Sequence, residues 1–274
     1  FDQFHPGENN LAVVTGKPLE IGGSLGRDEA TARGSWYATE QLLRRGGVPG
    51  LESLDGARVA VQGYGNAGSI AARLFHDAGG LIVAVSDSRG GISNDEGLDP
   101  RAILAHKDET GSVVGYPGAT AISNEDVLAY DCDVLIPAAL ECQIRIDNAH
   151  DVKAKVIVED ANGPLTAAAD EVLQRNGVVV LPDILANAGG VVVSYFEWVQ
   201  NLENQQWDLE KVEKRLKVKM YKAVDETVDR LAELQARHKD GLNKGKQGPT
   251  LRDAAMVSAI QRVATVVRQR DIWP

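Results

Sequence analysis

Three glycines in the spacing GxGxxG follow a short apolar run in the stretch VAVQGYGNAG, residues 59–68. A strand that turns sharply into a helix needs the conformational freedom of Gly63, and Gly68 allows the new helix to pack closely on the strand. Gly65 has no side chain that would hold a phosphate away, and the helix directs its unpaired N–H groups and positive dipole end toward an anion. The chemistry expected here is binding of the pyrophosphate of a dinucleotide.

A carboxylate stands at the end of the next apolar run, LIVAVSD, residues 81–87. Asp87 lies about 20 residues beyond the glycines, where an acidic side chain holds the 2'-hydroxyl of an adenine ribose and repels a 2'-phosphate. Ser88 and Arg89 come next, and an arginine at this place accepts a 2'-phosphate. We therefore predict NAD as the coenzyme, with NADP also possible.

Apolar runs of strand length alternate with helical patterns along most of the chain. We predict strands at 58–61, 81–87, 133–140, 156–160 and 178–183, a turn at Gly90 and Gly91, and helices from Asp28 to Arg45, after the glycine turn, near Ala102 to His106, after a cap at Ser123 and within 166–177. Two long amphipathic helices follow, at about 208–239 and 251–270. This alternation predicts an α/β fold with a doubly wound parallel sheet (Rossmann-like) and long C-terminal helices.

Length and composition narrow the class of protein. We expect the 274 residues to divide into an N-terminal segment at 1–30, a dinucleotide-binding domain at 31–205 and the C-terminal helices at 206–274. The formal net charge of −10 argues against a nucleic-acid partner. No apolar run approaches the roughly 20 residues that span a bilayer, and FDQFHPGENN at the start lacks the regions of a signal peptide. A cytoplasmic protein without membrane contact is therefore expected.

The residue types that bind metals or form disulfides show no pattern of that kind. The two cysteines, Cys132 and Cys142, lack metal-ligand spacing, and we expect both to be reduced thiols. The five histidines are scattered, without an i, i+4 pair or a carboxylate at metal spacing. No metal site is therefore predicted.

Five motifs in order carry a resemblance that covers the chain from about Val13 to Pro274: GKPLEIGGSLGRDEATARG, VQGYGNAG, VSDSRGGI, EDANGPLT and PDILANAGGVVVSYFEWVQN. Together they resemble the coenzyme-binding half of a glutamate dehydrogenase, of the glutamate/leucine/phenylalanine/valine dehydrogenase superfamily. The resemblance implies reversible oxidative deamination of L-glutamate to 2-oxoglutarate and ammonia, with hydride transfer to the nicotinamide of NAD or NADP.

The resemblance also implies which residues beyond the glycines contact the coenzyme. Thr31 is similar to a threonine that bonds the nicotinamide carboxamide, although a helix threonine also bonds back within its own helix. Asn162 is expected at the ribose, although asparagine before glycine is also an ordinary turn former, and Asn187 resembles the asparagine that meets the nicotinamide amide. The full set of implied contacts outside the three glycines is Thr31, Asn66, Ala67, Asp87, Ser88, Ala138, Ala139, Asn162 and Asn187.

Ser194, in VVVSYFEW, is the substrate marker that the resemblance implies. A hydroxyl at this position bonds the side-chain carboxylate of glutamate, whereas relatives that act on leucine, valine or phenylalanine carry an apolar residue. A buried hydroxyl left without a partner costs about 1 to 3 kcal/mol, so it discriminates against apolar substrates. Val191, one helical turn earlier, is expected to pack on the carbon chain of the substrate. An ordinary helix serine, and with it a dehydrogenase of another amino acid, stays open as an alternative.

The family resemblance further implies a separate N-terminal domain with a glycine-rich lysine motif, an activating lysine and a proton-relaying aspartate. These 274 residues hold none of them, so we expect no catalytic residue in this chain and no turnover by the chain alone. The expected partners are an N-terminal substrate domain or full-length subunits in a homo-hexamer. A non-catalytic nucleotide-binding or regulatory subunit, or a sensor module, is the alternative. Asp160 and Cys142 depart from the family pattern, where glycine and asparagine are common.

Overall fold

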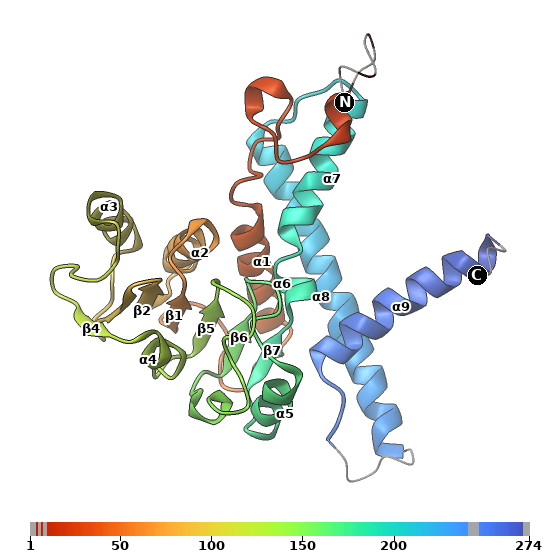
Figure 1. Cartoon of the computed structure of the whole chain (residues 1–274). Helices are drawn as coiled ribbons and strands as arrows, with labels where there is room; N and C mark the ends of the chain where they lie inside the picture. The colour runs from red at the N-terminus through yellow and green to blue at the C-terminus, as the bar shows by residue number, and fades with distance from the viewer. Residues whose placement is uncertain (1–3, 5–6, 8–9, 241–246, 271–274) are drawn as a thin grey trace.

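A seven-stranded sheet lies on one side of the molecule, and the long C-terminal helices lie on the other (Figure 1). The computed structural model describes residues 4, 7, 10–240 and 247–270. The strands are β1 (Arg58–Gln62), β2 (Leu81–Asp87), β3 (Gly90–Ser93), β4 (Thr120–Ile122), β5 (Val134–Pro137), β6 (Val156–Val158) and β7 (Val179–Leu181), in the order β4-β3-β2-β1-β5-β6-β7. All pairings among β1, β2, β5, β6 and β7 are parallel. The predicted Rossmann-like α/β sheet is therefore confirmed.

At the β3–β4 edge of the sheet, the structure differs from the predicted turn at Gly90 and Gly91. The turn lies at Ser88 and Arg89, and the two glycines predicted to form it lie in β3, which runs antiparallel to β2 and to β4. A Cβ on Gly91 would lie 2.8 Å from Cγ2 of Val127. This glycine therefore serves the close packing of a strand on a helix, a use that local sequence does not distinguish from a turn.

Helices cover both faces of this sheet. They are α1 (Ala30–Arg44), α2 (Asn66–Asp77), α3 (Pro100–Thr110), α4 (Asn124–Leu128), α5 (Ala167–Arg175), α6 (Asp183–Ala186), α7 (Gly189–Leu202), α8 (Leu209–Asp240) and α9 (Leu251–Gln269), with short 3-10 turns η1 (Leu11–Val13), η2 (Leu19–Ile21) and η3 (Ala149–Asp151). The predicted cap at Ser123 is present as a capping box with Asp126. Within the described residues, no helix has both the length and the apolar character needed to cross a bilayer.

Alternate side chains of each central strand enter different cores. Val59 and Val61 of β1 belong to a cluster with Phe75 of α2 and residues of α1 and α8, whereas Ala60 joins a second cluster with Val127 of α4 and residues of α5. Period-two alternation places successive side chains on opposite faces, so each strand supplies both cores. This arrangement is the doubly wound layering predicted from the sequence.

The two C-terminal helices are buried to very different extents. Apolar residues of α8 such as Leu216 and Met220 are buried, and α8 packs along α1, where Gln41 Nε2 donates to Asp225 Oδ1 at 2.7 Å. Helix α9 is buried only near its start, whereas Ile260 is 60% exposed, and Figure 1 shows it projecting from the body. The predicted apolar side of each helix is therefore present in both, but only that of α8 is buried along much of its length. The division of the chain at residues 30 and 205 stays a prediction.

Candidate coenzyme site

The glycine turn lies where strand order reverses, between the carboxyl ends of β1 and β5. Gly63 has a φ of 92°, and a Cβ built there would lie 2.9 Å from the Ala138 carbonyl oxygen and 2.9 Å from the Ala139 Cβ. A Cβ on Gly68 would lie 1.8 Å from the Gly63 carbonyl oxygen. The turn, the start of α2 and the two alanines after β5 are therefore brought together at the crevice where doubly wound sheets bind ligands.

The start of α2 fits an anionic group. Gly65 is the N-cap of α2, no side chain caps this end, and the first turn carries no acidic residue. A Cβ on Gly65 would meet no atom within 4 Å, so the space in front of the helix is open. Asn66 Nδ2 donates to the Asp28 carbonyl at 3.1 Å, which fixes the turn to the segment before α1. With Ala67 next in the helix, these residues have the donor set and the room that a pyrophosphate needs.

Asp87 ends β2 and is already engaged by the protein. Its carboxylate accepts hydrogen bonds from the Arg89 N–H at 2.9 Å, the Ser112 hydroxyl at 3.1 Å and the Val113 N–H at 2.7 Å. Three of about four lone-pair positions are thereby used. The carboxylate is buried and orders the loop after α3, a role that was missed because the donors in that loop, Ser112 and Val113, lie 25 and 26 positions away. Its contact with a ribose stays a prediction, and Ser88 beside it is exposed.

Two predicted asparagines meet at the carboxyl edge of the sheet. Asn187, which ends α6, donates from Nδ2 to Asn162 Oδ1 at 2.8 Å and to the Ala161 carbonyl at 3.3 Å. Asn162 lies in the loop between β6 and α5, and its side chain is exposed. Residues 25 positions apart are thus joined as one polar group at this edge of the sheet. Their contacts with a nicotinamide or its ribose stay predictions.

Thr31 lies in the first turn of α1, where that helix crosses the start of α7. A Cβ on Gly190 would lie 2.7 Å from Thr31 Oγ1, and a Cβ on Gly189 would lie 2.1 Å from the Ala30 carbonyl oxygen and 2.8 Å from the Gly34 Cα. The two glycines thus admit helix α1, whose backbone at Ala30 and Gly34 lies against Gly189 and whose Thr31 side chain lies against Gly190.

Ser194 has a partner that the sequence reasoning missed. Arg27 Nε donates to the Ser194 hydroxyl at 2.9 Å, and both side chains are half-buried. Val191, one turn earlier on α7, is 69% exposed. A cation paired with a hydroxyl is a suitable receptor for a carboxylate, because both donate to its oxygens. The arginine within GRDEAT was the available signal, but nothing in the local sequence links it to a residue 167 positions away.

The Asp160 side chain points into the protein. It is buried, the Ser35 hydroxyl donates to one of its oxygens, and the other oxygen has no partner among the described residues. Burial raises the pKa of the Asp160 carboxyl to about 6, and the bond from Ser35 opposes this only in part. This departure from the family pattern thus directs a carboxyl group at α1.

Cys142, the second departure from the family pattern, is exposed in the loop after β5. It has a φ of 53°, and its N–H donates to the Gly163 carbonyl at 2.9 Å. Asparagine adopts such left-handed angles more readily than cysteine does. Cys142 and the buried Cys132 are both free thiols.

Comparison with known proteins gives a consistent assignment. The family model described as Glutamate/Leucine/Phenylalanine/Valine dehydrogenase matches residues 22–271. The chain is 51% identical over 266 residues to the NADP-specific glutamate dehydrogenase A1 of Halobacterium salinarum, covering 96% of this chain and 59% of that protein. It is 47% identical over 269 residues to the glutamate dehydrogenase of Thermotoga maritima, covering 98% of this chain and 61% of that protein.

Solved structures agree with this assignment. The hetero-hexameric glutamate dehydrogenase of Thermus thermophilus superposes with a TM-score of 0.84 at 35% identity, covering 96% of this chain and 58% of that one. The glutamate dehydrogenase of Peptoniphilus asaccharolyticus gives a TM-score of 0.79 at 30% identity, covering 99% and 60%. The chain thus spans about 60% of the length of the curated relatives it matches. Because the family model covers most of its residues, the chain belongs to the glutamate/leucine/phenylalanine/valine dehydrogenase family.

Proposed function

We propose that this chain is the coenzyme-binding part of an NAD- or NADP-dependent glutamate dehydrogenase, which interconverts L-glutamate with 2-oxoglutarate and ammonia. The observation that carries the proposal is the open, uncapped start of α2 beside Gly65, at the point where strand order reverses. The two relatives that are about half identical to this chain are both glutamate dehydrogenases by name, which supports the reaction and the substrate.

Each group of residues has a distinct task in this proposal. The bound nicotinamide coenzyme supplies the hydride acceptor or donor. The N–H groups at the start of α2 hold the pyrophosphate, and the small side chains of Ala138 and Ala139 let the nucleotide approach the end of β5. Thr31 and the Asn162–Asn187 pair orient the nicotinamide half of the coenzyme. Their task is to position the reactive carbon of the ring and not to transfer protons.

Arg27 and Ser194 are proposed to recognise the side-chain carboxylate of glutamate. The 2.9 Å bond between them holds the guanidinium at the hydroxyl, so a carboxylate would receive donors from both. A leucine or valine side chain would bring no negative charge to this half-buried cation, which opposes the binding of an apolar substrate. The exposed Val191 lies on the same side of α7 and is suited to the aliphatic part of the substrate.

The partners in this proposal are a substrate domain or full-length subunits within a homo-hexamer, in the cytoplasm. Hydride transfer needs a cleft that closes on the substrate and excludes water. In this proposal the chain forms one side of that cleft and the substrate domain forms the other. The exposed apolar residues of α9, among them Ile260 and Val263, form a surface on which the substrate domain or another subunit can pack.

A Gly65→Val variant should bind NADH and NADPH at least about tenfold more weakly than the unchanged chain, because the new side chain enters the open space in front of α2. Its free energy of unfolding should stay within about 1 kcal/mol, since no described atom lies within reach of a Cβ there. Coenzyme fluorescence measures the affinity, and urea unfolding measures the stability.

The same samples test the reaction. With 2-oxoglutarate and ammonium, we expect oxidation of the reduced coenzyme when the chain is mixed with the purified N-terminal part of a glutamate dehydrogenase, and none by the chain alone. Binding without turnover in any mixture would favour the non-catalytic nucleotide-binding subunit. A folded chain that binds neither coenzyme would refute the proposal itself.

The coenzyme preference should depend on Arg89. This side chain is exposed at the turn after Asp87, and its guanidinium lies beside Gly111 without an ion pair inside the described ranges. An arginine placed there attracts a 2'-phosphate, and a charge-assisted bond contributes about 1.5 to 3 kcal/mol. Arg89→Ala should therefore weaken NADPH binding by about tenfold or more and leave NADH binding within about twofold. Equal effects on both would exclude a contact with the 2'-phosphate.

A further inference from the structure

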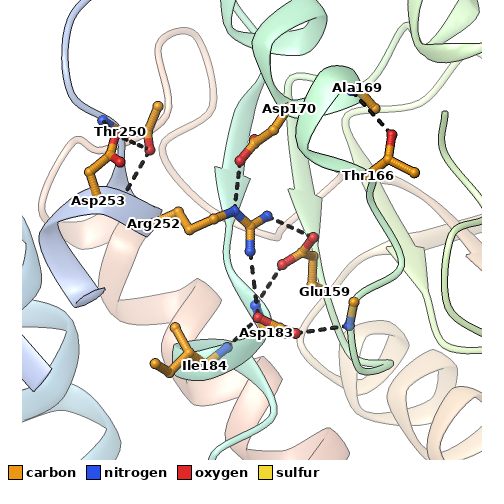
Figure 2. Close-up of polar contacts among 10 residues, drawn as sticks. Glu159, Thr166, Ala169, Asp170, Asp183, Ile184, Thr250, Arg252 and Asp253 are labelled. Carbon is orange, nitrogen blue, oxygen red and sulfur yellow. Dashed lines mark hydrogen bonds and ion pairs between the residues drawn. The ribbon is translucent and has the colours of Figure 1, made fainter. Parts of the chain in front are cut away.

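Arg252, in the first turn of α9, joins three carboxylates from three other elements (Figure 2). Its Nη2 lies 2.8 Å from Glu159 Oε1, its Nε 2.6 Å from Asp170 Oδ2, and its Nη1 3.5 Å from Asp183 Oδ1. Glu159 follows β6, Asp170 lies in α5 and Asp183 begins α6. One guanidinium thus links the first turn of α9 to the loop after β6, to α5 and to α6.

Two of these carboxylates, those of Glu159 and Asp183, also accept hydrogen bonds from backbone N–H groups near Asn162 and Asn187. Glu159 Oε2 accepts from the Asp183 N–H at 2.7 Å, and Asp183 Oδ2 accepts from the Gly163 N–H at 2.8 Å. Gly163 follows Asn162, which is bonded to Asn187 at the other end of α6. Hydrogen bonds and ion pairs therefore lead from α9 to Gly163, the peptide bond leads from there to Asn162, and a further hydrogen bond joins Asn162 to Asn187.

The charges make Arg252 necessary to this arrangement. The Glu159 side chain is fully buried, and burial raises its pKa while Arg252 opposes that rise. Without the guanidinium, Glu159 and Asp183 would repel each other across the N–H group that joins them. A buried carboxylate without a cation either moves toward water or takes up a proton. Either change would disturb the Asp183 oxygens that bind α6 and Gly163.

We propose that Arg252 is a positioning residue of the coenzyme site, which ties the base of α9 to the loop and helix that carry Asn162 and Asn187. The inference rests on the proposed coenzyme function and extends it to a residue on a helix outside the sheet. It predicts an effect confined to the nicotinamide half, since the glycine turn and α2 have no described contact with this cluster.

The test compares two ligands on one set of variants. Arg252→Met should weaken NADH binding by about tenfold and leave the binding of ADP-ribose, which lacks the nicotinamide, within about twofold. Arg252→Lys keeps one charge among the carboxylates and should give an intermediate loss. Hydrogen exchange at the Gly163 amide should become faster in Arg252→Met, because its acceptor on Asp183 is no longer held.

Arg262→Met is the matched control, since Arg262 lies on the same helix and pairs with Glu226 of α8 away from the cluster. It should change neither affinity. Equal losses for NADH and ADP-ribose, or no loss for either, would overturn the proposal. If Arg252→Met does not fold, Asp183→Ala removes the acceptor of the Gly163 amide and should show the same selectivity. An unchanged chain that binds neither ligand would instead refute the coenzyme function, while the exchange measurement still decides whether Arg252 holds Gly163.

Discussion

A Gly189→Ala variant is expected to lose about 3 kcal/mol or more of unfolding free energy, because a single added methyl forces two helices apart. Its Cβ would lie 2.1 Å from the Ala30 carbonyl oxygen and 2.8 Å from the Gly34 Cα, and both are backbone atoms that cannot turn aside. Helix propensity alone favours alanine over glycine by up to about 1 kcal/mol. The sign of the measured change therefore shows which effect prevails.

The measurement is urea unfolding of the variant beside Gly65→Ala, a substitution of the same kind in open space. The control should change stability by less than about 1 kcal/mol. Because α1 carries Thr31 and α7 carries Ser194, separating them should also weaken whatever both helices bind. A Gly189→Ala protein as stable as the unchanged chain would show that α1 and α7 do not cross as described.

The second large effect concerns Asp160 and the pH dependence of stability. Burial raises the pKa of this carboxyl from 3.8 to about 6, so the folded chain binds the proton more tightly than the unfolded chain does. Stability from this group is therefore fully present below pH 4 and is lost as the pH rises to about 6. A difference of about two pKa units corresponds to about 3 kcal/mol.

Asp160→Asn removes this titration. The stability of the variant minus that of the unchanged chain should rise by about 3 kcal/mol between pH 4 and pH 7 and then stay level. Taking the difference cancels the exposed and salt-bridged carboxyls, which the two proteins share. Asp108→Asn, a change at an exposed position, should give a flat difference. A flat difference for Asp160→Asn as well would mean that this carboxyl titrates normally in the folded chain.

The elements that the sequence predicted well are those specified by neighbouring residues. The glycine turn after β1, the apolar face of α8 and the Ser123 cap each depend on residues within a few turns or strands of each other. Their geometry is dictated by backbone freedom, side-chain periodicity and local hydrogen bonds, which can be inferred from the order of residue types along the chain. The assignment of Gly90 and Gly91 to a turn failed because two physical uses of glycine share one local pattern.

Contacts between distant segments could not be predicted in the same way. Arg252 finds its three carboxylates 69, 82 and 93 positions earlier, and Arg27 finds Ser194 after 167. Such pairs follow from strand order and helix crossing, and only the folded chain specifies those. Asp87 combines the two cases, because its place at the end of β2 was predictable and its donors in the loop after α3, Ser112 and Val113, were not.

The packing of α1 on α7 and α8 has a consequence for synthesis on the ribosome. Gln41 meets Asp225, 184 positions later in the chain, so the packing of α1 is completed only after the much later helix α8 has been made. While the sheet and α2 form and pack, the part of α1 that contacts α7 and α8 stays uncovered, and exposed apolar surface of this kind makes nascent chains attract chaperones or aggregate. Nascent chains halted before α7 should therefore remain protease-sensitive at α1, and the order of translation becomes part of how this fold is reached.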